Sequence, residues 1–187
     1  MLRARTIVVL LVALSLPASA LAGLSATSTA TARRTATGQA ASVTRAPSLE
    51  ELVLHEINAV RGRRGLGDLV SSPALSRSAA AHSRAMATYG FFSHESRNGV
   101  AFSERIKRFY GPRSGTWTVG ENLAMFGGST PTAAAIVDAW MGSPGHRANL
   151  LRGLFHEAGV AIMFNPAAGG VFGGDSTWVV TLDLGSR

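Results

Sequence analysis

The sequence predicts an α+β fold in which helices pack on a small antiparallel sheet. Segments with apolar residues at helical spacing come first after residue 48, and two short apolar runs typical of strands come last. Separate helical and strand regions of this kind are typical of helices packed against an antiparallel sheet. Hydrophobic residues make up 46% of the chain, so a sizeable core can form.

Three of the expected helices have an apolar stripe at helical spacing, and boundary residues mark the first two of them. The first is expected to begin at Ser48, which can form a capping box with Glu51. The second is expected to begin at Ser72 and Pro73 and to stop at Gly90, because a capping serine before proline starts a helix and glycine ends one. Further helices are expected over residues 101–109, 130–141 and 143–151.

Two strands are expected near the C-terminus, over residues 159–164 (GVAIMF) and 177–184 (TWVVTLDL). A Gly-rich stretch separates them, so they are expected to pair as a hairpin. The run 119–126 is also short and apolar, but it contains the polar pair Glu121 and Asn122.

Residues 1–22 are expected to be an export signal. A positive start (MLRAR) precedes the apolar run 6–16, and two small-x-small cleavage sites follow at 18–20 and 20–22. The alternative is an uncleaved anchor, although the apolar stretch is shorter than the roughly 20 residues of a membrane span. Residues 23–48, rich in Ser, Thr and Ala, are expected to be a flexible spacer before a domain over 49–187, with no membrane span after cleavage.

The distribution of charge argues against a nucleic-acid partner. The net charge is +7, but five of the positive charges precede the domain. Residues 49–187 hold thirteen basic and eleven acidic residues, a balance of +2, without the clustered basic face that nucleic-acid binding needs. The chain has no cysteine, which excludes disulfides and thiolate metal sites.

Four of the five histidines are assigned roles by their surroundings. His82 lies on the apolar stripe of the second helix and is expected to be a core histidine with one hydrogen bond. His55 and His156 each precede a glutamate but form no HExxH motif, so they are expected at the surface or at helix ends. His94 lies in a loop, where functional residues concentrate.

In the segment MGSPGHRANLL, Ser143 stands three residues before His146, which raises the question of a catalytic pair. The pair could be a nucleophile and its base, but Ser143 precedes Pro144 and therefore fits the cap of a helix.

Glu121 is an acid within an apolar run. It must meet a cation, a metal or backbone amides, because a buried carboxylate needs a partner.

Seven motifs, in this order along the chain, resemble the CAP superfamily of cysteine-rich secretory, antigen 5 and pathogenesis-related 1 proteins, in its cysteine-free bacterial branch. They are HEINAVRGRRGL, AHSRAM, FFSHES, VGENLA, AWMGSPGHRANLL, EAGVAI and WVVTLDLG. The resemblance implies a three-layer α–β–α sandwich around a central polar cleft. In many members two histidines and two glutamates line that cleft, and the histidines can hold a divalent metal.

The resemblance places the family's cleft residues on His94, Glu121 and His146. The second glutamate of the family stands three residues after a helix tryptophan, here Trp140, and that position holds Ser143. One carboxylate of the family set is therefore missing. His94 and His146 could bind a zinc-like ion with waters completing its shell, and Glu121 could orient a histidine or activate a water. The alternative is a buried hydrogen-bond network that fixes the wall of the cleft.

The expected function is a secreted or cell-envelope binding module, acting as a monomer, with no assured enzymatic step. Its expected partner is a small ligand, a lipid, an envelope polymer or an extracellular protein. The alternative is a hydrolase of the peptidase type that uses His94, Glu121 and His146, with or without a divalent metal such as zinc.

Overall fold

Three long strands form the centre of the molecule. They are β3 (Thr118–Gly127), β4 (Glu157–Asn165) and β5 (Thr177–Ser186), and β5 lies in the middle and runs antiparallel to both of the others. The computed structural model describes residues 42–113 and 117–187. The predicted export signal and residues 23–41 of the predicted spacer lie outside these residues.

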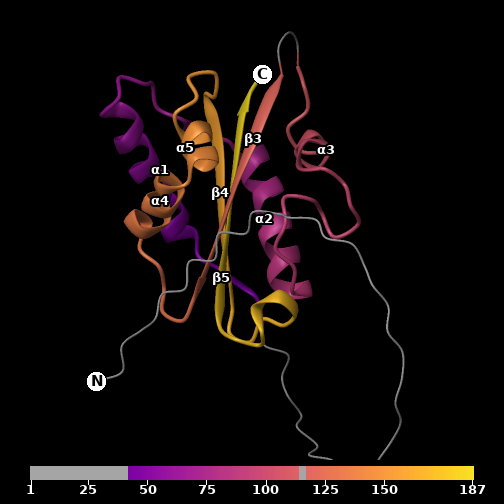
Figure 1. The fold of residues 1–187 in the computed structure, drawn as a ribbon. Coiled ribbons are helices and arrows are strands. Elements are labelled where there is room, and N and C mark those ends of the chain that lie inside the picture. Colours follow the sequence, from indigo (N-terminus) through magenta and orange to yellow (C-terminus); the bar gives the residue numbers. More distant parts are fainter. Residues whose placement is uncertain (1–41, 114–116) are drawn as a thin grey trace, which may run out of the picture.

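Helices cover both faces of the sheet, which gives the three layers visible in Figure 1. On one face lie α1 (Pro47–Gly62), α4 (Ala133–Gly142) and α5 (Pro144–Leu150). On the other lie α2 (Pro73–Tyr89) and α3 (Phe102–Lys107), and a short 3-10 turn, η1 (Gly170–Phe172), precedes β5. The α+β sandwich predicted from the sequence is confirmed. Among the described residues, no helix is long and apolar enough to cross a membrane.

Core residues lie on both sides of the sheet. Trp140 of α4 and Ile57 of α1 pack on one face, and Trp140 Nε1 also donates to the carbonyl of Leu123 at 3.0 Å. Met86 of α2 packs on the other face, against Val179 of β5. Burial on both faces explains why β4 and β5 are almost continuously apolar in sequence, because neither strand has a solvent side.

The second helix and the C-terminal hairpin form as the sequence predicts. α2 has Ser72 at its cap position and Pro73 as its first residue, and Gly90 ends it in the left-handed conformation with φ 70°. β4 and β5 pair directly and antiparallel. Gly159 in β4 is required by this packing, because a side-chain carbon there would collide with the backbone nitrogen of Ser76 in α2.

The N-terminal boundary of the fold differs from the prediction. The spacer was expected to extend to residue 48, but Thr44–Arg45 form β1, which pairs with β4, and α1 begins at Pro47 rather than after Ser48. Pro47 suits the first turn because proline lacks an N–H that would have no partner there. The Arg45 side chain also forms an ion pair with Glu50 at 2.7 Å, which holds this segment to α1.

Three other elements differ from what the sequence predicts. α4 begins at Ala133 rather than near residue 130, since the hydroxyl of Thr132 accepts from the N–H of Ala135 at 3.1 Å and caps the helix there. The apolar run 119–126 is part of β3, for which no strand was predicted. β2 (Val70–Ser71) is a second short strand beside β4, and it runs parallel to it.

Candidate functional site

Neighbouring residues of β3 reach opposite faces of the sheet, and this alternation builds the candidate site. The Glu121 side chain extends toward α3 and the loop after α2, where it contacts Arg105 and His94. The Asn122 side chain lies on the other face, where its Nδ2 donates to the carbonyl of His146 in α5 at 3.0 Å. Because β3 is an outer strand, the two faces meet around its edge.

Both carboxylate oxygens of Glu121 have partners. His94 Nδ1 lies 2.8 Å from Oε1, and Arg105 Nη2 donates to Oε2. The Glu121 side chain is fully buried and that of Arg105 is 7% exposed, so the ion pair is largely removed from water. The expectation that a buried acid here needs a partner is met by Arg105, a residue that sequence reasoning did not select.

Arg105 also holds the loop that carries His94. Its Nη1 donates to the backbone carbonyl of His94 at 3.0 Å and to the hydroxyl of Ser96 at 3.2 Å. The guanidinium of Arg105 therefore fixes both the carboxylate of Glu121 and the backbone of His94, whose side chain binds the same carboxylate. Planar groups with several donors, such as arginine, suit this kind of bridging.

Asparagine side chains attach α5 to the same strand. Asn149 Nδ2 donates to Asn122 Oδ1 at 2.9 Å and to the carbonyl of Glu121 at 3.2 Å. Gly120 lets the ring of Phe155 lie against the strand, because a side-chain carbon at this position would be 2.8 Å from that ring. The GENLA and GHRANLL motifs thus have two roles: they supply the polar side chains Glu121 and His146, and they dock α5 on β3 through Gly120, Asn122 and Asn149.

His94 and His146 face each other across the edge of β3. Their ring centroids are 6.5 Å apart, and the His94 side chain is 49% exposed. Burial, with a smaller contribution from His94, lowers the pKa of His146, which favours its neutral form at neutral pH. Among the described residues, the two ring nitrogens of His146 have no hydrogen-bond partner, and neither has Nε2 of His94. These three nitrogens are therefore open to a ligand.

His82 of α2 contacts the loop that carries His94 and positions it. It is 1% exposed, and its Nε2 lies 2.8 Å from the carbonyl of Ser93, so the expected core histidine with one hydrogen bond is confirmed. Burial is the main cause that lowers its pKa to about 4. A carbonyl can only accept, so Nε2 of the neutral ring carries the proton. The bond fixes the residue directly before His94.

Asp183 is a buried acid that sequence reasoning missed. It is the direct cross-strand partner of Glu121 and is 0% exposed. Neither of its carboxyl oxygens has a hydrogen-bond partner among the described residues. Burial, with the negative charge of Glu121 next, raises its pKa well above the usual value. A lone acid in the apolar run 177–184 is the same signal that singled out Glu121.

The remaining sequence candidates take structural or surface positions. Ser143 stands at the cap position of α5, before Pro144, as predicted, although its hydroxyl makes no capping bond. No hydrogen bond in the described part of the chain joins its hydroxyl to a histidine, so no nucleophile and base pair forms with His146. His55 and His156 are exposed, in agreement with their predicted surface positions.

The donor set does not make a complete metal site. Within residues 42–113 and 117–187, no three histidine, cysteine or acidic side chains are grouped to hold a metal ion. Two imidazoles sharing a tetrahedral zinc ion would place their ring centroids roughly 5 Å apart, whereas those of His94 and His146 are 6.5 Å apart. Zinc at these two residues stays a prediction.

Comparison with known proteins identifies relatives over most of the described chain. The model of the CAP, or cysteine-rich secretory protein, family matches residues 54–182. An uncharacterized protein of Bacillus subtilis, YkwD, is 37% identical over 135 residues, which are 70% of this chain and 48% of that protein. The chain therefore spans about half the length of this curated relative.

Solved bacterial structures share the fold. An extracellular protein with an SCP domain from Bacillus anthracis has a TM-score of 0.59 at 24% identity, over 75% of this chain and 41% of that one. An outer surface protein of Borrelia burgdorferi has a TM-score of 0.63 at 16% identity, over 77% and 98%. A cysteine-rich secretory protein of Staphylococcus aureus has a TM-score of 0.51 at 19% identity, over 75% and 39%.

Proposed function

The chain belongs to the cysteine-rich secretory protein (CAP) family, and on this premise we propose that it is an exported binding module whose ligand contacts His94 and His146. The observation that carries the proposal is the pair of facing imidazoles with open nitrogens. The buried ion pair of Glu121 and Arg105 holds His94, and Asn122 holds the backbone of His146. A rigid polar pair on a preformed support is how proteins fix the orientation of a bound group.

The engagement of Glu121 favours binding over hydrolysis. A general base must reach the proton that it removes, but both oxygens of Glu121 already accept hydrogen bonds. Its role in the proposal is therefore to position His94. The neutral ring of His146 offers one donor and one acceptor, which suits a ligand hydroxyl or carboxyl group. Such groups occur in envelope polymers, in lipid headgroups and on extracellular proteins.

Export is part of the proposal. The solved structures with the same fold are described as extracellular, outer surface or secretory proteins. Residues 1–22 carry the sequence features of an export signal. We therefore place the protein outside the membrane, free or at the cell envelope, as a monomer.

A hydrolase of the peptidase type is the second candidate, and one observation favours it. His94 Nδ1 contacts a buried carboxylate, while its Nε2 has no hydrogen-bond partner among the described residues and the side chain is partly exposed, which is the arrangement of a base and the group that orients it. Such a reaction would need a water or substrate group as nucleophile, because Ser143 makes no bond to a histidine.

One set of variants separates the two functions. The full chain and its Glu121→Gln, His146→Ala and His156→Ala variants are incubated with generic peptide and ester substrates, and separately with labelled lipids and envelope polymer followed by gel filtration. The binding module predicts no turnover, and co-elution of one labelled ligand that is lost in His146→Ala but kept in His156→Ala. Turnover that disappears in His146→Ala but is kept in His156→Ala would establish the hydrolase and overturn the binding-only function.

A further inference from the structure

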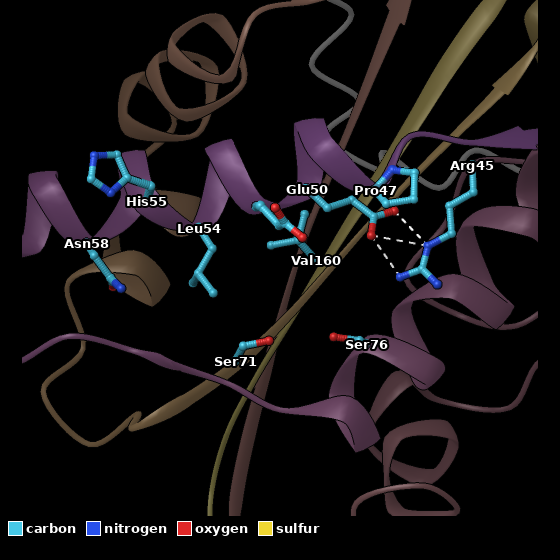
Figure 2. Close-up of a pocket in the computed structure, with 10 residues that line it drawn as sticks. Arg45, Pro47, Glu50, Leu54, His55, Asn58, Ser71, Ser76 and Val160 are labelled. Atoms are coloured by element: carbon cyan, nitrogen blue, oxygen red, sulfur yellow. Dashed lines mark hydrogen bonds and ion pairs between the residues drawn. The ribbon is translucent and has the colours of Figure 1, made fainter.

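A polar groove lies at the opposite edge of the sheet from His94. It has a volume of about 490 Å³ and runs between α1 and the segment from β2 to the start of α2, with Val160 of β4 at its floor (Figure 2). Pockets of this size accommodate small ligands.

Two short strands occupy the outer edge of β4 but leave a gap between them. On one side of the gap, Ser72 N–H donates to the carbonyl of Ala158 at 2.8 Å, next to β2. On the other side, Ala46 N–H donates to the carbonyl of Ile162 at 3.1 Å, next to β1, and the N–H of Ile162 donates to a carboxylate oxygen of Glu50 at 3.0 Å.

The peptide groups of Val160 lie in this gap. In an antiparallel pair, the N–H and C=O of alternate residues point to the same side. Those of Ile162 point to the outer edge, so those of Val160, two residues earlier, also point there and away from Leu182 in β5. No partner for them is found among residues 42–113 and 117–187. A backbone donor and acceptor at a sheet edge need a partner, from water or from a ligand.

The surrounding side chains add hydroxyls and one free negative charge. The hydroxyls of Ser71 and Ser76 turn toward one another beside Val160 (Figure 2). The carboxylate of Glu50 is engaged by Arg45 and by Ile162 N–H, but Glu51 has no ion-pair partner in the described part of the chain. The open groups thus suit a ligand with an amide and a cation.

The length of the gap limits the ligand. β1 and β2 block the edge on both sides of Val160, so an extended strand has no room to add along β4. A chain end can still enter from solvent, place one residue opposite Val160 and form two hydrogen bonds with it. This geometry favours the terminus of a peptide over an internal segment.

We propose that this groove binds the amino-terminal end of a short peptide. One amide of the peptide pairs with the N–H and C=O of Val160, and its terminal ammonium group lies against the carboxylate of Glu51. The site is separate from His94 and His146, and it does not depend on the function proposed for them.

Backbone NMR of the full chain tests the groove with two probes, the tripeptide Ala-Ala-Ala amide and its N-acetylated form. Before any peptide is added, the Val160 amide hydrogen should exchange faster than that of Ala161, which faces β5. Addition of the free tripeptide should shift the Val160 amide resonance and slow its exchange. Equal protection of the two amides in the free protein, or an unchanged Val160 resonance with saturating peptide, would overturn the proposal.

Variants test the charged contact. Acetylation of the peptide and the Glu51→Gln substitution should each weaken binding by roughly two- to fivefold, the range of an exposed ion pair, and together they should weaken it no further. Glu104→Gln, at an exposed residue of α3, is the matched control and should bind as the wild type does. His94→Ala should also leave binding unchanged. Equal affinity of wild type and Glu51→Gln for the free peptide would show that Glu51 makes no contact.

Discussion

Glu121 and Asp183 lie directly opposite each other in the neighbouring strands β3 and β5, and both carboxyl groups are buried. Arg105 supplies a positive charge to Glu121 through a direct hydrogen bond, whereas the Asp183 oxygens have no partner among the described residues. Two like charges this close in the interior are unfavourable, so one carboxyl keeps its proton. The burial and contacts assign that proton to Asp183 and the negative charge to Glu121.

Replacement of Asp183 by asparagine should stabilise the protein at neutral pH. The raised pKa of Asp183 means that the folded state holds a proton which the unfolded chain releases above its ordinary value near 4. The contribution of Asp183 to the stability of the wild type therefore falls as pH rises toward the folded pKa, by about 1.4 kcal/mol for each unit of the raised pKa. The Asp183→Asn variant has no proton to release at this position and therefore does not lose stability in this way. Melting temperatures of both proteins between pH 4 and 8 should diverge in its favour, and a variant that is less stable at pH 7 would mean an ionised, paired Asp183.

Replacement of Glu121 by glutamine should destabilise the fold strongly. The change leaves the buried guanidinium of Arg105 without its counter-charge, a loss of about 3–5 kcal/mol for a buried pair. Arg105→Gln should cost a similar amount, because it leaves Glu121 charged and buried. Denaturant unfolding of the two single variants and the double variant measures the coupling. The double variant should be less destabilised than the sum of the single ones, and additive losses would contradict a direct pair.

His82 should make stability depend on pH in the acidic range. Its folded pKa of about 4 is below the unfolded value near 6.5, so the unfolded chain binds an additional proton between these values. The contribution is fully present above pH 6.5 and is lost as pH falls to 4, up to about 3 kcal/mol. The difference in unfolding free energy between wild type and His82→Gln should grow by this amount as pH rises from 4 to 6.5, because the opposing contribution of Asp183 is common to both proteins. Parallel curves would exclude a buried neutral His82.

Zinc binding, if His94 and His146 are its ligands, should be weak and should require both. Two imidazoles are fewer than the three protein ligands usual in open zinc sites, and their rings must approach before they share an ion. Calorimetric titration of zinc should give weak binding to the wild type and to His156→Ala, an exposed histidine at another place. It should give none to His94→Ala or His146→Ala. Identical isotherms for wild type and His94→Ala would remove these two residues as a metal site.

Much of the fold follows from local sequence patterns. Ser72, Pro73 and Gly90 mark the ends of α2 because capping and backbone conformation are properties of a few adjacent residues. The β4–β5 hairpin follows from two apolar runs with a Gly-rich connection. The start of α1 was misplaced because Ser48 also fits a cap, and only the pairing of Thr44 and Arg45 with β4 decides between the two starts.

The sequence by itself determined the α+β class, the family and the choice of His94, Glu121 and His146. Only the tertiary structure decided that these residues meet, that Arg105 neutralises Glu121 and that Asp183 lies beside it. The physical reason is that strand register and helix docking are set by packing between distant segments. No local pattern states which residue stands opposite Glu121, or that Val160 lies between two strands that meet the same edge.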